Sequence, residues 1–356
     1  MSGGRPRLWC AEPRWSASWA SIELFNTTVF EGLLPLVFYL SLSFDILEKL
    51  TQRSQSSASG FLPSVAQTVL SFTMSKPIIQ HLHLSALTPY KTATALQDAI
   101  AKQFLAHKAS PSEKTLPPPT VLTFTPPPVY TTGRRETDDA YPPSLVETLK
   151  QPLKHTSTRA EFEKASRGGL ITFHGPGQLV IYPTMSLRQP SSFPSYTNAK
   201  PLTPKCYVSL LESVTVSLLN NYGLNAFRTS DPGVWVNSRI PPGDFATSDE
   251  AKIAALGTHL RRNVTTYGVG LNVSTDMRWF DKITACGIEG KGVTSLAREI
   301  GIGFETVEQE RQGLEAIAQA WVGEFARQVG GREVEVRKVQ EGEILEQLGL
   351  AKWVKK

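Results

Sequence analysis

The chain has 356 residues, of which 40% are hydrophobic and 19% charged, and it carries 37 basic residues against 32 acidic ones. This composition is typical of a globular protein long enough for one sizeable core. The net charge of +5 is a mild excess, which suits an acidic protein partner better than a nucleic-acid duplex. The three cysteines, Cys10, Cys206 and Cys286, are too few and too widely spaced for a disulfide framework or a Cys-x-x-Cys metal site.

Residues 1–73 differ in composition from the rest of the chain. Their first 20 residues hold three arginines, three tryptophans and a single glutamate. The uncharged apolar run at 32–44 is 13 residues long, whereas a membrane-spanning helix needs about 20. We therefore predict a targeting leader or a poorly ordered extension, with no stable membrane insertion. Met74 is an alternative start, because no acidic residue lies between it and Asp98.

From Ile78 onward the pattern predicts both helices and strands. Thr88-Pro89 is typical of a helix start, and apolar residues then recur at spacings of three and four until Pro111. Two further helices are predicted at 204–222 and 306–329, the second opened by a Thr-x-x-Gln capping box. Strand-length apolar runs lie at 121–124, 170–173, 179–182, 234–236, 253–256 and 269–273.

The predicted fold class is α+β, with a mostly antiparallel sheet flanked by helices, because strands and helices do not alternate strictly along the chain. We assign the main domain to residues 74–332 and a C-terminal extension to 333–356. Stretches rich in proline and serine at 110–119, 189–204 and 238–250 are predicted to be surface loops.

The densest chemical feature is the segment from Arg167 to Gln178, RGGLITFHGPGQ. Its four glycines allow backbone N–H groups to approach a ligand where a side chain would collide. A hairpin with glycines at its tight turns is the alternative. Arg167 and His174 favour ligand binding, although the first can be a surface charge and the second a satisfied core imidazole.

Cys286 and Lys252 offer a thiol and an amine for covalent catalysis. Cys286 lies in the glycine-flanked stretch TACGI, and Lys252 stands at the head of an apolar run. A free cysteine titrates at about pH 8.5, so a lysine ammonium nearby would raise the thiolate fraction at neutral pH. The alternatives are that Cys286 is a small buried hydrophobe and that Lys252 is a solvated charge at a strand end.

Several segments together resemble, in sequence order, the motifs of the lipoate-protein ligase B family, the lipoyl(octanoyl) transferases. The matching stretches are PVYTTGRR (128–135), RGGLITFHGPGQLVIYP (167–183), GVWV (233–236), KIAALG (252–257) with Arg261 and Arg262, GVGLNV (268–273), CGI (286–288) and GVTSL (292–296). Ala285 stands where the family usually has proline, and Gly270 where it usually has alanine. Both differences concern local turn geometry rather than chemistry.

The resemblance implies a fold similar to the catalytic domain of biotin and lipoate protein ligases. Family members transfer an octanoyl group from acyl carrier protein to a specific lysine of lipoyl-domain proteins, through a thioester on the cysteine that matches Cys286. Lys252 matches the lysine that lowers the pKa of that cysteine and assists proton transfer. By the same match the substrate site comprises Arg167, Gly168, Gly169, Leu170, Ile171, Thr172, Phe173, His174, Ala255, Leu256, Gly257, Gly268, Val269 and Gly270.

The implied partners are octanoyl-acyl carrier protein as donor and lipoyl-domain proteins as acceptors, such as the glycine cleavage H protein and the E2 subunits of 2-oxoacid dehydrogenases. We expect Arg167 to meet the acidic carrier or its phosphopantetheine arm. Thioester exchange is nearly isoenergetic and aminolysis of a thioester runs downhill, so no nucleotide or other cofactor is expected. In a eukaryotic cell these partners are mitochondrial, and with the leader they predict a mitochondrial location.

Three other functions would use a similar chain differently. An ATP-dependent lipoate or biotin ligase would activate the acid as an adenylate and would not need a nucleophilic cysteine. A cysteine hydrolase would normally pair cysteine with histidine and pass the acyl group to water. A non-catalytic protein that binds acyl carrier protein would leave Cys286 unacylated.

Overall fold

The computed structural model describes residues 77–137, 139–188, 202–238, 249–284, 290–330 and 334–350. The predicted leader and Cys286 lie outside these residues, as do most of the predicted loops at 189–204 and 238–250. Among the helices of the described ranges, none has both the length and the apolar character that crossing a membrane requires.

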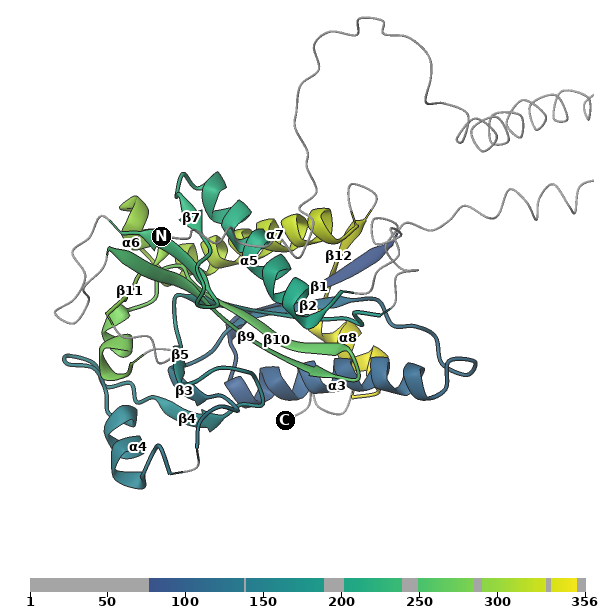
Figure 1. The fold of residues 1–356 in the computed structure, drawn as a ribbon, viewed down its shortest axis with the longest axis horizontal. Coiled ribbons are helices and arrows are strands. Elements are labelled where there is room, and N and C mark those ends of the chain that lie inside the picture. The colour runs from purple at the N-terminus through teal and green to yellow at the C-terminus, as the bar shows by residue number, and fades with distance from the viewer. Residues whose placement is uncertain are drawn as a thin grey trace, which may run out of the picture. The chain divides into compact units, whose positions relative to one another are not determined.

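A mixed sheet forms the centre of the fold (Figure 1). Within the described residues it has nine strands in the order β12-β1-β2-β6-β10-β9-β8-β7, with β11 beside β9. The strands from β2 through β6, β10, β9 and β8 to β7 pair antiparallel, whereas β1 is parallel to β2 and β12, and β11 is parallel to β9. The strands are β1 (Ile78–Leu87), β2 (Thr120–Thr125), β6 (Gln178–Thr184), β7 (Ala226–Phe227), β8 (Val234–Asn237), β9 (Glu250–Arg261), β10 (Val264–Asn272), β11 (Gly292–Val293) and β12 (Glu335–Val339).

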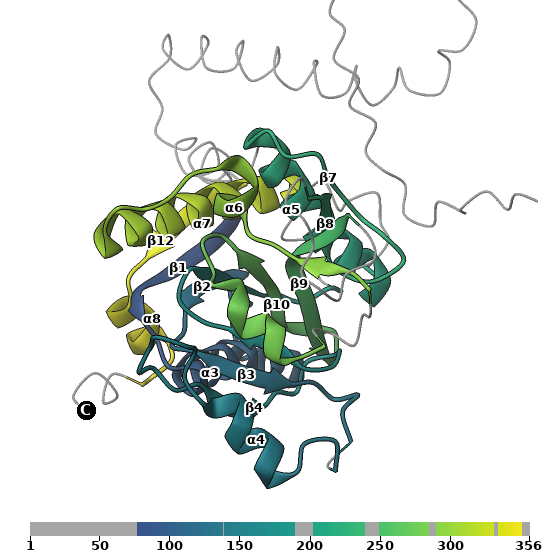
Figure 2. The same ribbon diagram turned by 90° about the vertical axis from the view of Figure 1, so that its left-hand side faces the viewer.

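Helices cover both faces of this sheet, as Figure 2 shows. Helix α3 (Tyr90–Ala109) packs on one face, and α5 (Pro204–Asn221) and α7 (Val307–Gly330) pack together on the other. Successive side chains of a strand point to opposite faces, so Ile181 joins the core beneath α5 and α7 while Tyr182 joins the core beneath α3. The predicted α+β class, with a mostly antiparallel sheet flanked by helices, is confirmed.

The three helices with clear sequence signals lie where they were predicted. The Thr306 half of the capping box of α7 is formed, because the Gln309 N–H donates to Thr306 Oγ1 at 3.1 Å. The Gln309 side chain accepts instead from the N–H of Glu305, the residue before Thr306, at 2.9 Å. Shorter elements were not predicted: α4 (Pro143–Lys150), the 3-10 helix η3 (Met277–Lys282), α6 (Leu296–Ile300) and α8 (Glu341–Gln347).

A small second sheet lies beside the main one, in the order β4-β3-β5. It consists of β3 (Val129–Thr132), β4 (Glu161–Lys164) and β5 (Thr172–His174). Its core is aromatic: the ring of Phe173 stacks on Trp279 with centroids 5.1 Å apart. Strand β5 is part of the glycine-rich segment, which continues from it into β6 of the main sheet.

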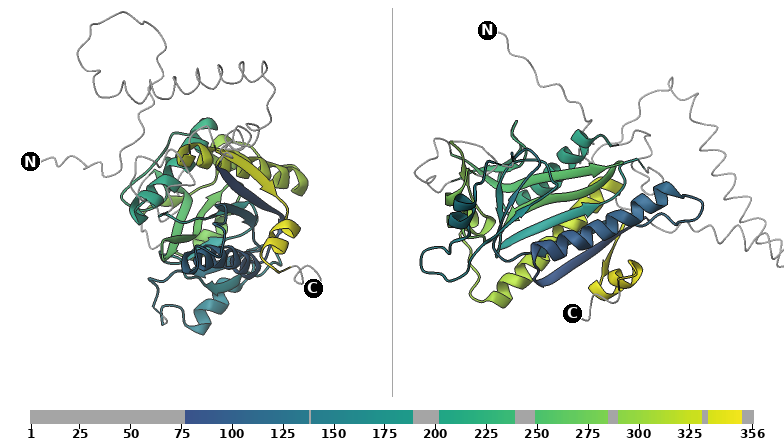
Figure 3. Two further views of the ribbon diagram at one scale, coloured as in Figure 1. Left: turned by 90° about the vertical axis from the view of Figure 1, so that its right-hand side faces the viewer. Right: turned by 90° about the horizontal axis from the view of Figure 1, so that it is seen from below.

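The predicted C-terminal extension contributes an edge strand to the main sheet. Strand β12 pairs in parallel with β1 from Ile78↔Glu335 to Leu82↔Val339. Helix α8 then buries Ile344 and Leu345 in the core beneath α3, and Figure 3 shows α8 close to α3. Residues 335–347 of the predicted C-terminal extension thus pack on the main domain, and a boundary at residue 332 separates an edge strand from its sheet.

A pair of histidines on β1 makes the stability of the fold depend on pH. His81 Nε2 and His83 Nδ1 each lie 2.9 Å from Thr123 Oγ1. Burial, followed by the neighbouring charge of His83, lowers the pKa of His81 from 6.5 to about 4. The folded protein therefore binds fewer protons than the unfolded chain between these values, so stability is full above pH 6.5 and is lost as the pH falls toward 4.

We expect His81→Gln to flatten this acid-side loss, because an amide can still pair with Thr123 and does not titrate. The contribution of His81 is on the order of 3 kcal/mol when the pH falls below its folded pKa. Urea unfolding at several pH values from 7.5 to 4.5 measures it for both proteins. Parallel stability curves for the wild type and the variant would contradict the prediction.

Candidate active site

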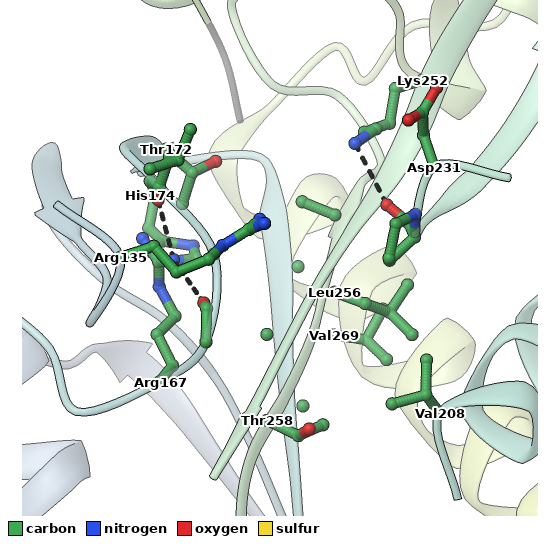
Figure 4. A pocket seen from close by; sticks show the side chains of 18 of the residues that line it. Arg135, Arg167, Thr172, His174, Val208, Asp231, Lys252, Leu256, Thr258 and Val269 are labelled. Carbon is green, nitrogen blue, oxygen red and sulfur yellow. Dashed lines mark hydrogen bonds between the residues drawn. The ribbon is translucent and has the colours of Figure 1, made fainter. Parts of the chain in front are cut away.

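A cavity of about 410 Å³ lies where the glycine-rich segment meets strands β9 and β10 (Figure 4). Strand pairing explains why the motifs at 252–257 and 268–273 share it: Gly257 lies opposite Gly268, and Ala255 opposite Gly270. The Gly168 N–H donates to Thr258 O at 3.0 Å, which fixes the glycine-rich segment beside them. The predicted residues that line the cavity are Arg167, Gly168, Gly169, Leu170, Thr172, His174, Lys252, Ala255, Leu256, Gly257, Gly268, Val269 and Gly270.

Two predicted substrate-site residues do not line this cavity. Ile171 and Phe173 alternate with Leu170, Thr172 and His174, so their side chains are buried in the core of the small sheet instead. They support the wall of the cavity from behind.

Six lining residues were not predicted: Arg135, Tyr182, Val208, Asp231, Pro232 and Thr258. Arg135 is the last residue of the PVYTTGRR motif, and Asp231 and Pro232 directly precede GVWV. Their place in or beside a motif was the sequence signal that could have identified them. Tyr182 lies within the motif at 167–183, which was a signal for it as well. Val208 has only the apolar pattern of α5, which does not distinguish a cavity wall from an ordinary core position.

The close approach of strands at Gly268 leaves no room for a side chain. A Cβ atom there would lie 2.3 Å from the Ile181 carbonyl oxygen of the neighbouring strand. At Gly257 a Cβ would lie 2.8 Å from Arg167 Cδ and 3.1 Å from Gly168 O. Glycine at both positions therefore brings the two motifs into contact around the cavity.

We expect Gly268→Ala to destabilise the protein by about 1 to 3 kcal/mol, because the strand backbone itself must shift. Gly323→Ala is the matched control: it lies exposed within α7, a Cβ there meets no atom within 4 Å, and alanine favours helix. Urea midpoints report both changes. Equal stability of the two variants would refute this account of Gly268.

Arg167 is buried, with only 6% of its surface exposed. Its Nη1 donates to the carbonyls of Gly168 (3.1 Å) and Leu170 (2.9 Å), and its Nη2 donates to Thr131 O (2.6 Å) and Oγ1 (2.7 Å). The guanidinium thus clamps the glycine-rich loop to β3. The expected contact of Arg167 with the acidic carrier or its phosphopantetheine arm stays a prediction, and Arg167 lines the cavity that such an arm would enter. The exposed cation on the cavity wall is Arg135.

His174 is a buried, neutral imidazole on the cavity wall. Burial, followed by the positive charge of Arg167, lowers the pKa of His174 to about 3. Its ring stacks on Tyr90 with centroids 5.7 Å apart, and Nδ1 lies 2.6 Å from Gln178 Oε1. It cannot carry a charge at neutral pH.

Lys252 is buried on β9, with 5% of its surface exposed, so the alternative of a solvated charge at a strand end does not hold. Its Nζ donates to Pro232 O at 3.1 Å and lies 4.7 Å from the centre of the Trp235 ring, which is its pairing partner on β8. Lys291 lies 4.6 Å from the same ring and forms ion pairs with Glu250 (2.8 Å) and Asp231 (3.3 Å). Asp231 directly precedes Pro232, so its ion pair with Lys291 holds in place the backbone carbonyl that accepts from Lys252.

The described chain that follows Cys286 runs beside Lys252. Strand β11 pairs in parallel with β9, placing Val293 opposite Lys252, and the Thr294 N–H donates to Lys252 O at 3.0 Å. The placement of the thiol itself lies outside the described residues.

Comparison with known proteins identifies the family. Residues 89–318 match the lipoyl protein ligase A/B catalytic domain. The chain is 38% identical over 223 residues to a probable octanoyltransferase of Schizosaccharomyces pombe, covering 61% of this chain and 86% of that one. It is 35% identical over 228 residues to the mitochondrial octanoyl-[acyl-carrier-protein]:protein N-octanoyltransferase LIPT2 of Danio rerio, covering 64% and 85%. A solved bipartite lipoate protein ligase of Thermoplasma acidophilum aligns with a TM-score of 0.49 and 13% identity, over 78% of this chain and 93% of that one.

The length and identity of these sequence matches confirm the resemblance seen in the motifs. The chain therefore belongs to the lipoyl protein ligase A/B catalytic family, and it is an acyltransferase akin to the lipoyl(octanoyl) transferases.

Proposed function

We propose that the protein transfers an octanoyl group from octanoyl-acyl carrier protein to a lysine of a lipoyl-domain protein, through a thioester on Cys286. The observation that carries the proposal is the buried Lys252 on the wall of a cavity whose other walls come from the glycine-rich segment, β9 and β10. Relatives from Danio rerio and Homo sapiens that are named octanoyl-[acyl-carrier-protein]:protein N-octanoyltransferases support the donor and the transferred group.

The cavity suits an apolar chain with a reactive polar end. Val208, Leu256 and Val269 contribute apolar surface, and each CH₂ group of an acyl chain buried there contributes about 0.8 kcal/mol to binding. Lys252 and Asp231 supply polar groups on the same cavity wall. An acyl chain against the apolar wall would place its carbonyl near the amine.

The proposed reaction has two balanced half-reactions. The thiolate of Cys286 attacks the donor thioester carbon, the bond to the pantetheine sulfur breaks, and the carrier leaves as a thiol after gaining a proton. The amine of the acceptor lysine then attacks the acyl-enzyme, loses a proton, and releases the Cys286 thiolate as the amide forms. Lys252 stabilises the thiolate as an ammonium and then gives its proton to the departing carrier sulfur. The resulting Lys252 amine takes the acceptor's proton in the second half-reaction, which restores the ammonium beside the released thiolate.

Purified protein, octanoyl-acyl carrier protein and a lipoyl domain test this function when they are mixed without ATP. We expect the lipoyl domain to gain one octanoyl group on a lysine, and free octanoate with ATP to give no product. Dependence on ATP and free octanoate would instead support the ATP-dependent ligase. Release of octanoate without an acceptor would support a hydrolase.

A mitochondrial location follows from the proposed partners and from residues 1–73 as a leader. The relatives from Danio rerio and Saccharomyces cerevisiae are named as mitochondrial. We expect a C-terminally tagged full-length chain to colocalise with mitochondria in a eukaryotic cell. A second chain that starts at Met74, the alternative start, tests whether residues 1–73 are needed for import. A stable cytosolic signal from both chains would exclude the proposed location.

A further inference from the structure

A chain of buried amides behind the cavity fixes the orientation of His174. Asn272 Nδ2 donates to Thr294 O at 3.0 Å, which leaves Asn272 Oδ1 to accept from Gln178 Nε2 at 2.8 Å. Gln178 Nε2 also donates to Phe173 O at 3.1 Å. Both amides are thus oriented by backbone carbonyls, which can only accept.

This orientation determines the tautomer of His174. Because the Gln178 amide nitrogen faces Phe173 and Asn272, its Oε1 faces His174 Nδ1 at 2.6 Å. An amide oxygen cannot donate, so Nδ1 must carry the ring proton. Nε2 is then an unprotonated acceptor.

Nε2 of His174 is buried and has no hydrogen-bond partner among the described residues. A buried acceptor left unpaired costs roughly as much as a lost hydrogen bond, and His174 lines the cavity. We propose that Gln178 and Asn272 are positioning residues, which hold His174 as the Nδ1–H tautomer so that Nε2 accepts a hydrogen bond from a neutral N–H group of the substrate. The identity of that substrate rests on the proposed function.

The charge of the surroundings selects a neutral donor. Arg167 already places a buried positive charge close enough to depress protonation of His174, so an ammonium would be repelled there. The reaction offers two neutral N–H donors: an amide of the donor's pantetheine arm, and the amine of the acceptor lysine in its reactive form. The two enter in different half-reactions, so kinetics distinguishes them.

The same chain of hydrogen bonds connects His174 to the strand of Lys252. Thr294 donates its N–H to Lys252 O at 3.0 Å and accepts from Asn272 through its own carbonyl. Asn272 therefore couples the backbone at Lys252 to the imidazole on the cavity wall. A substitution at Asn272 or Gln178 should disturb His174 without touching the substrate.

The tautomer is measured on the full chain by ¹⁵N NMR of labelled histidine, with the His174 signal assigned by its loss in His174→Gln. The sequence has six histidines, so the spectrum is sparse. We expect wild-type His174 to be protonated on Nδ1 and unchanged from pH 6 to 8. Protonation on Nε2 would overturn the proposal, and this result does not depend on enzymatic activity.

The rates of the two half-reactions are compared between Gln178→Met and the control Gln80→Met. Gln80 is another buried glutamine; it lies on β1, and its Oε1 accepts from Thr120 at 3.2 Å. We expect only Gln178→Met to give a mixed tautomer and to slow one half-reaction roughly tenfold, which corresponds to about 1.4 kcal/mol. Slower acylation with a raised donor KM identifies the pantetheine amide, and slower aminolysis alone identifies the acceptor amine. Equal rates in the two variants would overturn the proposal.

Gln178→Glu provides a third readout. Its carboxylate still accepts from Nδ1, so the tautomer should be retained, but its charge should raise the pKa of His174. The rate should then fall on the acid side of neutrality, where the wild type shows no such change. A pH profile identical to that of the wild type would contradict the role of Nε2.

Failure of wild-type Cys286 to be acylated would refute the proposed function, while the NMR measurement would still decide the tautomer.

Discussion

Replacing Cys286 with serine or alanine should reduce octanoyl transfer to background. The hydroxyl of serine has a much higher pKa than a thiol, which leaves almost no nucleophile at neutral pH, and alanine leaves none. Steady-state transfer to a lipoyl domain measures the loss. Cys10→Ser, in the predicted leader, is the matched control and should keep full activity. Turnover by Cys286→Ala at the rate of the control would rule out a covalent cysteine mechanism.

Lys252→Met should produce the second largest effect, and its two proposed roles can be separated. Without the ammonium, the apparent pKa for alkylation of Cys286 should rise, with about 1.4 kcal/mol of lost stabilisation for each tenfold loss of thiolate. Acylation at neutral pH should slow accordingly and partly recover at high pH. Methionine fills similar space, so these changes report the charge rather than the packing.

The second role of Lys252 concerns the acceptor lysine. If Lys252 takes the proton from the incoming amine, deacylation by the lipoyl domain should fail in Lys252→Met at every accessible pH. Lys282→Met is the control, because the Lys282 ammonium also lies over a tryptophan ring, 4.8 Å from the centre of Trp279, but Lys282 does not line the cavity. Unchanged alkylation pKa and unchanged rates of both half-reactions in Lys252→Met would show that Lys252 is a bystander.

Much of the fold was predictable where local signals and tertiary packing agree. Helix α7 combines a capping box with apolar residues at helical spacing, and the same residues pack against α5 in the structure. Strand β12 gave no such signal: four of its five residues are exposed, as expected for an edge strand with polar side chains. Its pairing with β1 joins residues more than 250 positions apart, which a local pattern does not reveal.

The residues of the candidate site likewise fall into those that the sequence predicted and those that only the fold reveals. The segment 167–178 could be singled out from its own residues, because four glycines, an arginine and a histidine are concentrated in it. The stretches 255–257 and 268–270 were implied only by the resemblance to the family. The role of Arg167 could not be predicted, because its carbonyl partner on Thr131 lies 36 residues away and only the fold brings the two together. Val208 lines the cavity from a helix whose pattern is that of a core helix.

The covalent intermediate is the central claim, and intact-mass analysis tests it most directly. Wild-type protein mixed with octanoyl-acyl carrier protein, without acceptor, should gain the mass of one octanoyl group. Peptide mapping should place that group on Cys286, and adding a lipoyl domain should remove it as the lipoyl domain gains it. Transfer to the lipoyl domain with no adduct on Cys286 at any time would contradict the mechanism.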